Sequence, residues 1–378
     1  MRSLTLVLVL SGLLALPAVG WAEDTSKTTT SPSSASDVTV PEQSPNDAAL
    51  RAAAERITAE HVRQVGAASS DPVPPVADPQ AAYQDLLAPP PVKPEKGWPL
   101  PLHTIESVGG VGLTEMAHLV NPSVGNDWLG LPSLSFTHVQ TGHQNAEIGS
   151  ISETLFKRLE LSFSNDYVGL GDFDLAVKNK LGVSLGTDYV QFYNAGARLA
   201  LVNEGDYGQS WLPAVTAGVH YKYNATINEF NNELGGALNK VVGVKDYQGV
   251  DYTLTATKMF KDVLPRPFFV SGTVRNTDSV DTGWLGFTNE RRTVFEGNVG
   301  VFVRPDFVLA AEYREMPNDI KLKQLPPGVL GVPSDWWTLA AAYVIDRHWT
   351  VSAAYANLGN VLNHKEPASL WLQVKYEF

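Results

Sequence analysis

Hydrophobic and polar residues alternate along much of the C-terminal two thirds of the chain. The clearest run is 370–378 (LWLQVKYEF), in which aliphatic and aromatic residues alternate with mostly polar ones. Successive side chains of a strand point to opposite faces, so this run predicts a strand with one apolar and one mixed face. A buried edge strand of a soluble sheet would show the same pattern. The closing strand of an outer-membrane β-barrel would also explain why its outer face is so apolar.

Eleven further segments are also predicted strands, and period-2 alternation is clear in many of them. The twelve predicted strands are 105–118, 132–141, 153–164, 189–202, 211–223, 249–260, 267–277, 292–303, 306–316, 336–345, 348–357 and 369–378. Most have the roughly 9–11 residues of a tilted membrane-crossing strand, although the first is rich in glycine and the least regular. Aromatic residues gather near strand ends, as interfacial girdles would: Trp211, Tyr223, Tyr252, Phe260, Trp336, Trp337 and Trp349.

The connections between these segments alternate in length. Long connections such as 358–368 and 224–248 follow short ones such as 346–347 and 304–305. Outer-membrane barrels pair short periplasmic turns with long outer loops, so the parity places both termini in the periplasm. We therefore predict an all-β fold, a transmembrane antiparallel barrel of about 12 strands in a Gram-negative outer membrane. Two long loops have helical spacing, 172–182 and 228–243, and would cap the pore, lie on the outer leaflet, contact a partner or simply pack as loops.

The N-terminal third differs in composition from the rest. Residues 1–22 combine a charged start, an apolar run and small residues before Glu23, which predicts a signal peptide. Residues 23–101 are rich in Ser and Pro and predict a disordered periplasmic tether with one short helix at about 46–66. The predicted barrel spans 102–378. No later segment has the roughly 18 consecutive apolar residues of a spanning helix.

Placing the apolar face of each strand outward puts a polar set inside the lumen. The candidate lumen-lining residues are Arg158, Glu160, Arg198, His220, Lys222, Asp251, Arg275, Glu296, Glu312, Arg314, Lys375 and Glu377, together with several serines and threonines. Acidic and basic groups are nearly balanced, which favours ion pairs across the lumen over a single-sign ladder. Two interpretations stay open: the charges pair and fill a narrow lumen, or some of them line a path for a polar solute.

Other chemistry is limited by the residues available. The chain has no cysteine, so thiol chemistry and disulfides are excluded. We find no serine-hydrolase elbow or zinc-binding helix motif, and His138, the one strand histidine predicted to face outward, lacks an obvious nucleophile beside it. We expect no enzyme activity, no cofactor and no metal. The net charge of −12 argues against nucleic-acid binding.

Several runs together resemble one known family. They are GVGLTEMAHLVNP (110–122), SWLPAVTAGVHYKYN (210–224), VGVKDYQGVDYTLTATKMF (242–260), GWLGF (283–287), LAAEYREMPND (309–319) and DRHWTVSAAYANLGN (346–360). Their order is similar to that of an uncharacterised bacterial outer-membrane family, a domain-of-unknown-function family numbered in the three-thousand-thirties. The resemblance covers about 105–378. It implies an exported barrel and supplies no activity or catalytic residue.

Our first hypothesis is a narrow channel for small polar solutes. The alternative is a closed structural or interaction barrel that displays outer loops and is tethered in the periplasm; a barrel enzyme comes third. The expected partners are outer-membrane lipid and the barrel-assembly machinery, with Tyr376 and Phe378 as the assembly signal in the C-terminal strand.

Overall fold

A computed structural model of the chain describes residues 100–317 and 326–378. The predicted signal peptide, the helix at 46–66 and nearly all of the predicted tether lie outside the described residues. Among the helices within these ranges, none is long and apolar enough to cross a membrane.

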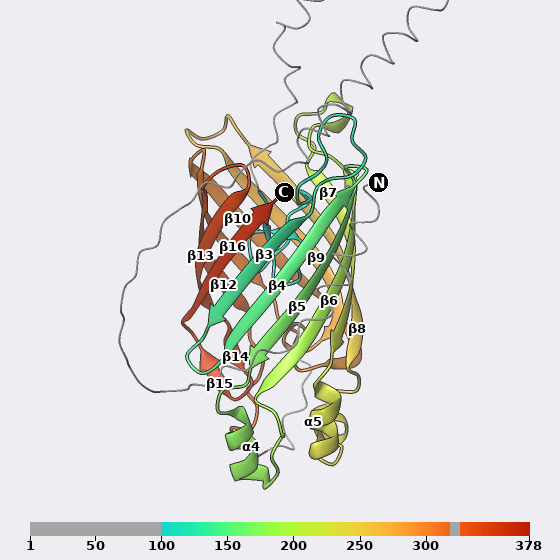
Figure 1. The fold of residues 1–378 in the computed structure, drawn as a ribbon, viewed down its shortest axis with the longest axis vertical. Helices are drawn as coiled ribbons and strands as arrows, with labels where there is room; N and C mark the ends of the chain where they lie inside the picture. Colours follow the sequence, from blue (N-terminus) through green and yellow to red (C-terminus); the bar gives the residue numbers. More distant parts are fainter. Residues whose placement is uncertain (1–99, 318–325) are drawn as a thin grey trace, which may run out of the picture. The chain divides into compact units, whose positions relative to one another are not determined.

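Twelve antiparallel strands form a closed barrel, as the alternating pattern predicts (Figure 1). The strands are β3 (Ser133–Gln140), β4 (Asn145–Leu155), β5 (Leu159–Gly169), β6 (Tyr189–Val202), β7 (Ala214–Asn224), β8 (Gln248–Phe260), β9 (Phe268–Ser279), β10 (Phe287–Arg304), β11 (Phe307–Arg314), β12 (Trp336–Val344), β13 (Trp349–Asn357) and β16 (Ser369–Glu377). Each strand pairs with its neighbour in sequence along the barrel. β16 then pairs with β3, from Leu370 opposite Gln140 to Glu377 opposite Ser133, which closes the sheet.

Two strand predictions are wrong, and their errors cancel in the count. The predicted strand 105–118 is not in the barrel wall but in a segment inside the lumen, described below. The predicted strand 153–164 is the end of β4, a turn at 156–158 and the start of β5. Phe156 and Lys157 take positive φ values of 51° and 59° in this turn, which non-glycine residues seldom adopt. Because the turn contains no Gly, Pro or Asn, the sequence gives no turn signal there.

Most of the short turns and most of the long loops lie at opposite ends of the barrel. The short-turn end holds the turns 156–158, 203–213, 261–267, 305–306 and 345–348, and Phe378 lies at the same end, where its backbone N–H donates to Pro132. The long-loop end holds the connections 141–144, 170–188, 225–247, 280–286, 315–335 and 358–368. The predicted long outer loop 119–131 is therefore wrong, because the first connection at that end is the four-residue turn 141–144.

The long loops carry short elements that pack over the barrel mouth (Figure 1). These elements are α4 (Phe173–Leu181), α5 (Ile227–Glu233), a π-helical turn η2 (Leu238–Val242), a 3₁₀ turn η3 (Asp281–Gly283) and the hairpin of β14 (Gly359–Val361) with β15 (His364–Glu366). The two predicted loop helices, 172–182 and 228–243, thus correspond to α4 and to α5 with η2. Their apolar side chains join one buried cluster that includes Phe173, Phe230 and Trp284.

The outer wall of the barrel is an apolar belt between aromatic side chains. Exposed aliphatic residues such as Leu199, Leu254 and Leu339 cover its middle. Aromatic pairs lie near both ends, among them Tyr193–Tyr223 and Trp337–Tyr355 at the long-loop end and Phe260–Phe268 and Trp349–Tyr376 at the short-turn end. This distribution is typical of a barrel whose wall contacts lipid. Trp336 is an exception to the predicted girdle: it is 1% exposed and packs against Trp284 inside the mouth.

Candidate functional site in the barrel lumen

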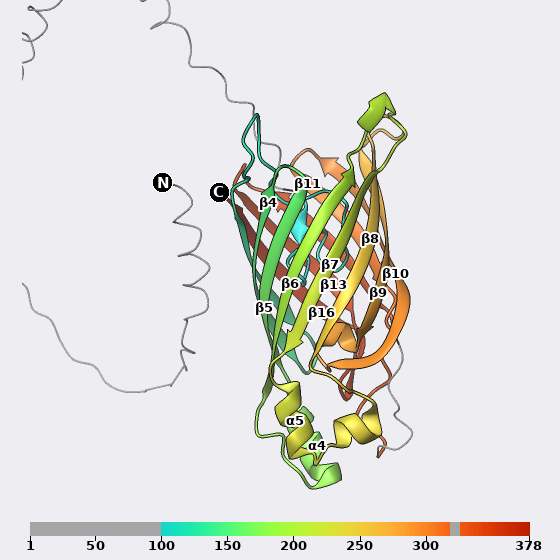
Figure 2. The same ribbon diagram turned by 90° about the vertical axis from the view of Figure 1, so that its right-hand side faces the viewer.

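Residues 101–121 lie inside the barrel, and we call them the plug. Their regular structure is a two-residue pairing of β1 (Leu102–His103) with β2 (Gly109–Gly110) and an isolated bridge between Gly110 and Glu115, and the plug is visible as the blue-green segment within the wall in Figure 2. Nearly every plug residue is buried. Gly110 allows the tight course of the chain, because a Cβ atom there would lie 2.2 Å from the carbonyl oxygen of Thr114. The glycine-rich pattern that weakened the strand prediction is thus explained by close backbone approach.

Arg198 of β6 binds the plug backbone at two positions, Gly109 and Met116. Its guanidinium makes a two-pronged contact with Glu160 of β5, with Nε–Oε1 and Nη2–Oε2 distances of 3.0 Å each. It also donates to the carbonyl oxygens of Gly109 and Met116 at 3.1 and 2.7 Å. Glu160 in turn accepts from the backbone N–H of Val120 at 2.6 Å. Paired wall charges therefore bind backbone groups of the plug, including the carbonyl oxygen of Met116 and the N–H of Val120.

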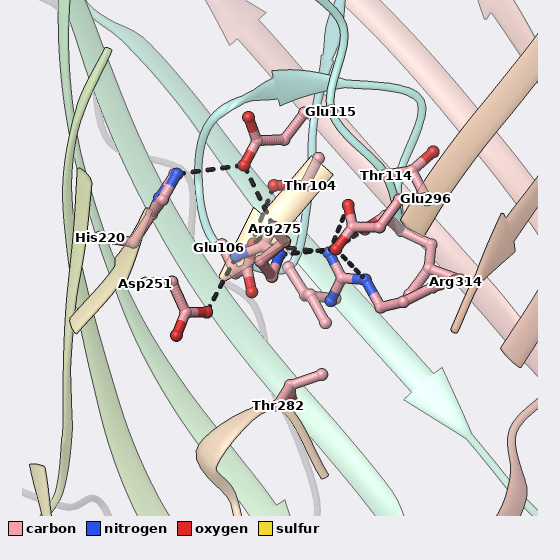
Figure 3. Close-up of polar contacts among 12 residues, drawn as sticks. Thr104, Glu106, Thr114, Glu115, His220, Asp251, Arg275, Thr282, Glu296 and Arg314 are labelled. Atoms are coloured by element: carbon pink, nitrogen blue, oxygen red, sulfur yellow. Dashed lines mark hydrogen bonds and ion pairs between the residues drawn. The ribbon is translucent and has the colours of Figure 1, made fainter. Parts of the chain in front are cut away.

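Glu106 inserts a plug carboxylate among three cations of the wall, two of which, Arg275 and Arg314, are labelled in Figure 3. Its Oε1 lies 2.7 Å from Lys222 Nζ, and its Oε2 lies 2.7 Å from Arg275 Nη2 and 3.5 Å from Arg314 Nη2. Burial raises the pKa of Glu106, but Arg275, Lys222 and Arg314 outweigh burial and leave this pKa well below its usual value. Glu106 is therefore charged, and it neutralises positive charge that the wall would otherwise expose to the lumen.

Glu115 supplies the second plug carboxylate. Its Oε1 lies 3.0 Å from His220 Nε2 and 3.1 Å from Arg275 Nη2, and its Oε2 lies 3.6 Å from Arg198 Nη1. Arg275 thus contacts both plug carboxylates, and its Nη1 also lies 3.0 Å from Asp251. Its Nε lies 2.6 Å from Glu296 of β10, so one guanidinium on β9 links the plug to β8 and β10.

The remaining plug contacts are of two kinds. In one, a wall carboxylate accepts hydrogen bonds from the plug backbone; in the other, both partners are neutral. Glu312 of β11 accepts from the backbone N–H groups of Leu113 and Thr114 at 2.9 and 2.7 Å. Asn298 of β10 donates to Thr114 Oγ1 at 2.9 Å. At the other end of the plug, His103 lies between Ser135 and Ser152, with both ring nitrogens 2.7 Å from a hydroxyl. The plug is therefore bonded around most of the barrel circumference.

The space left around these charges is very small. A cavity of about 10 Å³ lies among Glu106, Lys222, Asp251 and Arg275, which is about the room that one water molecule needs. Glu106, Glu115 and His220 come close enough to share a metal ion. Arg275 already lies against both carboxylates, however, so a divalent cation would have to displace it. The donor set fits ion pairing better than metal binding.

A second layer closes the lumen at the long-loop end. The loop 280–286 folds inward, and Asn224 donates to the carbonyl oxygens of Gly283 and Trp284 at 3.1 and 2.7 Å. Asp281 is 2% exposed in this loop, and burial raises the pKa of its carboxyl to about 7. In this conformation the lumen is thus closed in the middle by ion pairs and at the long-loop end by an apolar cluster.

Most of the predicted lumen residues point inward. Those that are 5% exposed or less are Glu160, Arg198, His220, Lys222, Asp251, Arg275, Glu296, Glu312, Arg314, Lys375 and Glu377. Wall residues also pair with one another: Glu296 contacts Arg275 Nε at 2.6 Å and Arg314 Nε at 3.1 Å, and Lys375 contacts Glu377 at 2.6 Å. Arg158 does not belong to this set. It lies in the turn after β4, and its side chain is 50% exposed and 3.8 Å from Asp206.

The sequence prediction missed the two plug carboxylates. Glu106 and Glu115 lie in a segment without strand periodicity, so no alternation argument could place them. A weak signal was present: two acidic residues stand in an otherwise glycine-rich and apolar run, where each must find a cation if the run is buried.

These features define a class of protein: a closed antiparallel β-barrel with an apolar outer wall and a lumen filled by its own chain. Residues 101–375 match the family described as "Protein of unknown function (DUF3034)", and the chain belongs to this family. None of the curated proteins matches the chain.

Some solved barrels are similar in outline. The KdgM porin is 10% identical with a TM-score of 0.40, and the match covers 65% of this chain and 99% of the porin. Omp33 of Acinetobacter baumannii is 9% identical with a TM-score of 0.35, covering 66% and 99%. The outer membrane phospholipase A of Escherichia coli is 11% identical with a TM-score of 0.34, covering 67% and 99%. We draw no functional conclusion from likenesses of this size.

Proposed function

We propose that the protein is an outer-membrane barrel that acts as a narrow, gated channel for small polar solutes, and that the plug is its gate. The apolar belt and the aromatic pairs at both barrel ends support the outer membrane as its location. The short-turn end would face the periplasm, with Phe378 in the strand that the barrel-assembly machinery recognises. The lipid around the wall and the solute in the lumen would be its other partners.

The observation that carries the proposal is the charged wall behind the plug. Buried ion pairs are seldom the most stable way to fill a cavity, since apolar residues of similar volume often do as well or better. A wall that carries Arg198, Lys222, Arg275 and Arg314 is suited to a lumen that also fills with water. The plug has almost no regular structure and is held by these charges together with neutral hydrogen bonds rather than by pairing with the wall strands, so its release would leave the wall intact.

The closed-barrel alternative also has a specific observation in its favour. The apolar cluster at the long-loop end, which includes Trp284 and Trp336, would have to open as well before a solute could pass. If that cluster never opens, the protein would instead present α4, α5 and the β14–β15 hairpin to an external partner. In both cases we propose binding or passage rather than catalysis. His138, the outward strand histidine considered for catalysis in the sequence analysis, lies on the outer wall and is paired with Glu147 at 2.5 Å.

Planar-bilayer recording separates these functions. We expect the full-length chain to show few or no current steps, and the Glu106→Gln/Glu115→Gln double variant to show frequent ones. The double variant should also admit small sugars or amino acids in a liposome-swelling assay. Electrophoretic heat-modifiability would establish that both proteins are folded barrels. A folded double variant with a displaced plug and no current would favour the closed-barrel function.

A further inference from the structure

The short-turn end of the barrel contains a large cavity that the proposed channel does not require. Its volume is about 580 Å³, within the roughly 300–1,000 Å³ range of small-molecule sites. The plug residues Val111 and Met116 bound it on the side toward the middle of the barrel, and the barrel wall bounds it around the sides. We call this space the short-turn chamber.

The wall of the short-turn chamber is apolar, although the same strands carry charges nearer the middle of the barrel. On β11 the inward residues Val308 and Ala310 line the chamber, whereas Glu312 and Arg314 on the same face contact the plug. Val308 is opposite Ala342 on β12, and Ala310 is opposite Ala340. These alanines leave the space that larger side chains would fill. Met259, Phe269 and Phe302 from β8, β9 and β10 complete the apolar wall.

Polar groups lie at one side of the chamber and differ in how far they are neutralised. Glu204 accepts from Lys258 Nζ at 2.6 Å, and Glu377 contacts Lys375 at 2.6 Å, so both carboxylates that line the chamber are paired with cations. Lys157, in the turn between β4 and β5, is exposed and donates to the backbone carbonyl of Gly125. The Lys157 ammonium group thus donates to a neutral acceptor.

We propose that the short-turn chamber binds a single-chain amphiphile with an anionic head, of the fatty-acid class. The aliphatic tail would lie against Ala310, Ala342, Val308 and the plug, and the carboxylate would lie at Lys157. A purely polar solute would gain little from this wall, and a vestibule used only by water would have no need of it. The inference goes beyond the channel function, because a chamber roofed by the plug can bind its ligand whether or not the plug moves.

Photolabelling tests the site directly. The probe is palmitic acid with a diazirine near the end of its tail, added to the full-length chain in phosphatidylcholine vesicles. We expect saturable labelling of inward residues, including Met259 and Phe302, that unlabelled palmitate abolishes. Labelling confined to the outward, lipid-facing side chains of the same strands would overturn the proposal, as would inward labelling that palmitate does not compete.

Two variant pairs give matched controls. Ala310→Phe/Ala342→Phe fills the chamber and should reduce inward labelling about tenfold or more, whereas Ala311→Phe/Ala341→Phe places the same side chains on the adjacent outward positions and should not. Lys157→Gln should weaken palmitate competition by about two- to fivefold, the scale of one exposed ion pair. Lys261→Gln, in the turn after β8, should leave it unchanged. Equal labelling in the filled and control variants, if both are folded, would refute the site.

Discussion

The charge on Glu106 provides the sharpest test of how the plug is held. Glu106→Gln keeps the size of the side chain and an acceptor oxygen but removes the charge that faces Lys222, Arg275 and Arg314 at 2.7, 2.7 and 3.5 Å. Removing one partner from a buried ion group costs about 3–5 kcal/mol, because the remaining charges are left uncompensated. If that cost falls on plug docking, the undocked population should rise roughly a hundredfold to a few thousandfold.

Thiol labelling measures that population, because the chain has no cysteine of its own. Val108 is fully buried in the plug, so a Val108→Cys reporter should react with a charged methanethiosulfonate only after the plug leaves. We expect the reporter to react much faster in the Glu106→Gln background than alone. Glu147→Gln, which alters an acidic residue of the outer wall, is the matched control and should not change the rate. Equal reporter rates in all three folded proteins would refute the view that ion pairs hold the plug.

Three further predictions concern other contacts. Gly110→Ala should displace the plug and speed labelling of the Val108→Cys reporter, because the added Cβ would lie 2.2 Å from a backbone oxygen. Gly112→Ala should be tolerated, because the nearest atom to its Cβ is 3.5 Å away. Docking of the loop 280–286 should weaken as pH rises from about 4 through 7. Burial favours the protonated form of Asp281 and raises its pKa to about 7 in the folded chain, so the docked loop loses stability as this carboxyl ionises. Hydrogen exchange of the loop should show this pH dependence, and Asp281→Asn should abolish the dependence. Arg198→Lys should lower the free energy of unfolding by about 2–4 kcal/mol, because the two-pronged carboxylate contact is lost. Arg158→Lys, at an exposed site, should change the free energy of unfolding by less than about 0.5 kcal/mol.

The barrel was predictable from sequence because a strand wall repeats every two residues. That period places Arg275 and Arg314 inside and Leu339 outside without knowledge of their partners. The count of twelve strands nevertheless depended on two opposite errors. The turn at Phe156 and Lys157 has no turn residues, so two strands were merged, and the plug was counted as a strand in their place.

The centre of the site could not be predicted in the same way. A plug has no register with the wall, so nothing in its spacing shows that Glu106 will meet Lys222 or that Glu115 will meet His220. Those contacts depend on the path of residues 101–121 through a lumen whose width is set by all twelve strands. The apolar short-turn chamber was missed because alanines on β11 and β12 fit a strand pattern equally well on either face.

The central claim is that the plug opens and closes the lumen, and a reversible tether tests it most directly. Thr114 of the plug and Asn298 of β10 are hydrogen-bonded at 2.9 Å, so cysteines at both positions can be joined by a short, reducible bis-methanethiosulfonate crosslinker. Single-channel current would be recorded from this cysteine pair in the Glu106→Gln/Glu115→Gln background. We predict current steps that cease when the plug is tethered and return on reduction. Current that persists through a complete tether, or silence after the plug has been shown to leave, would contradict the account.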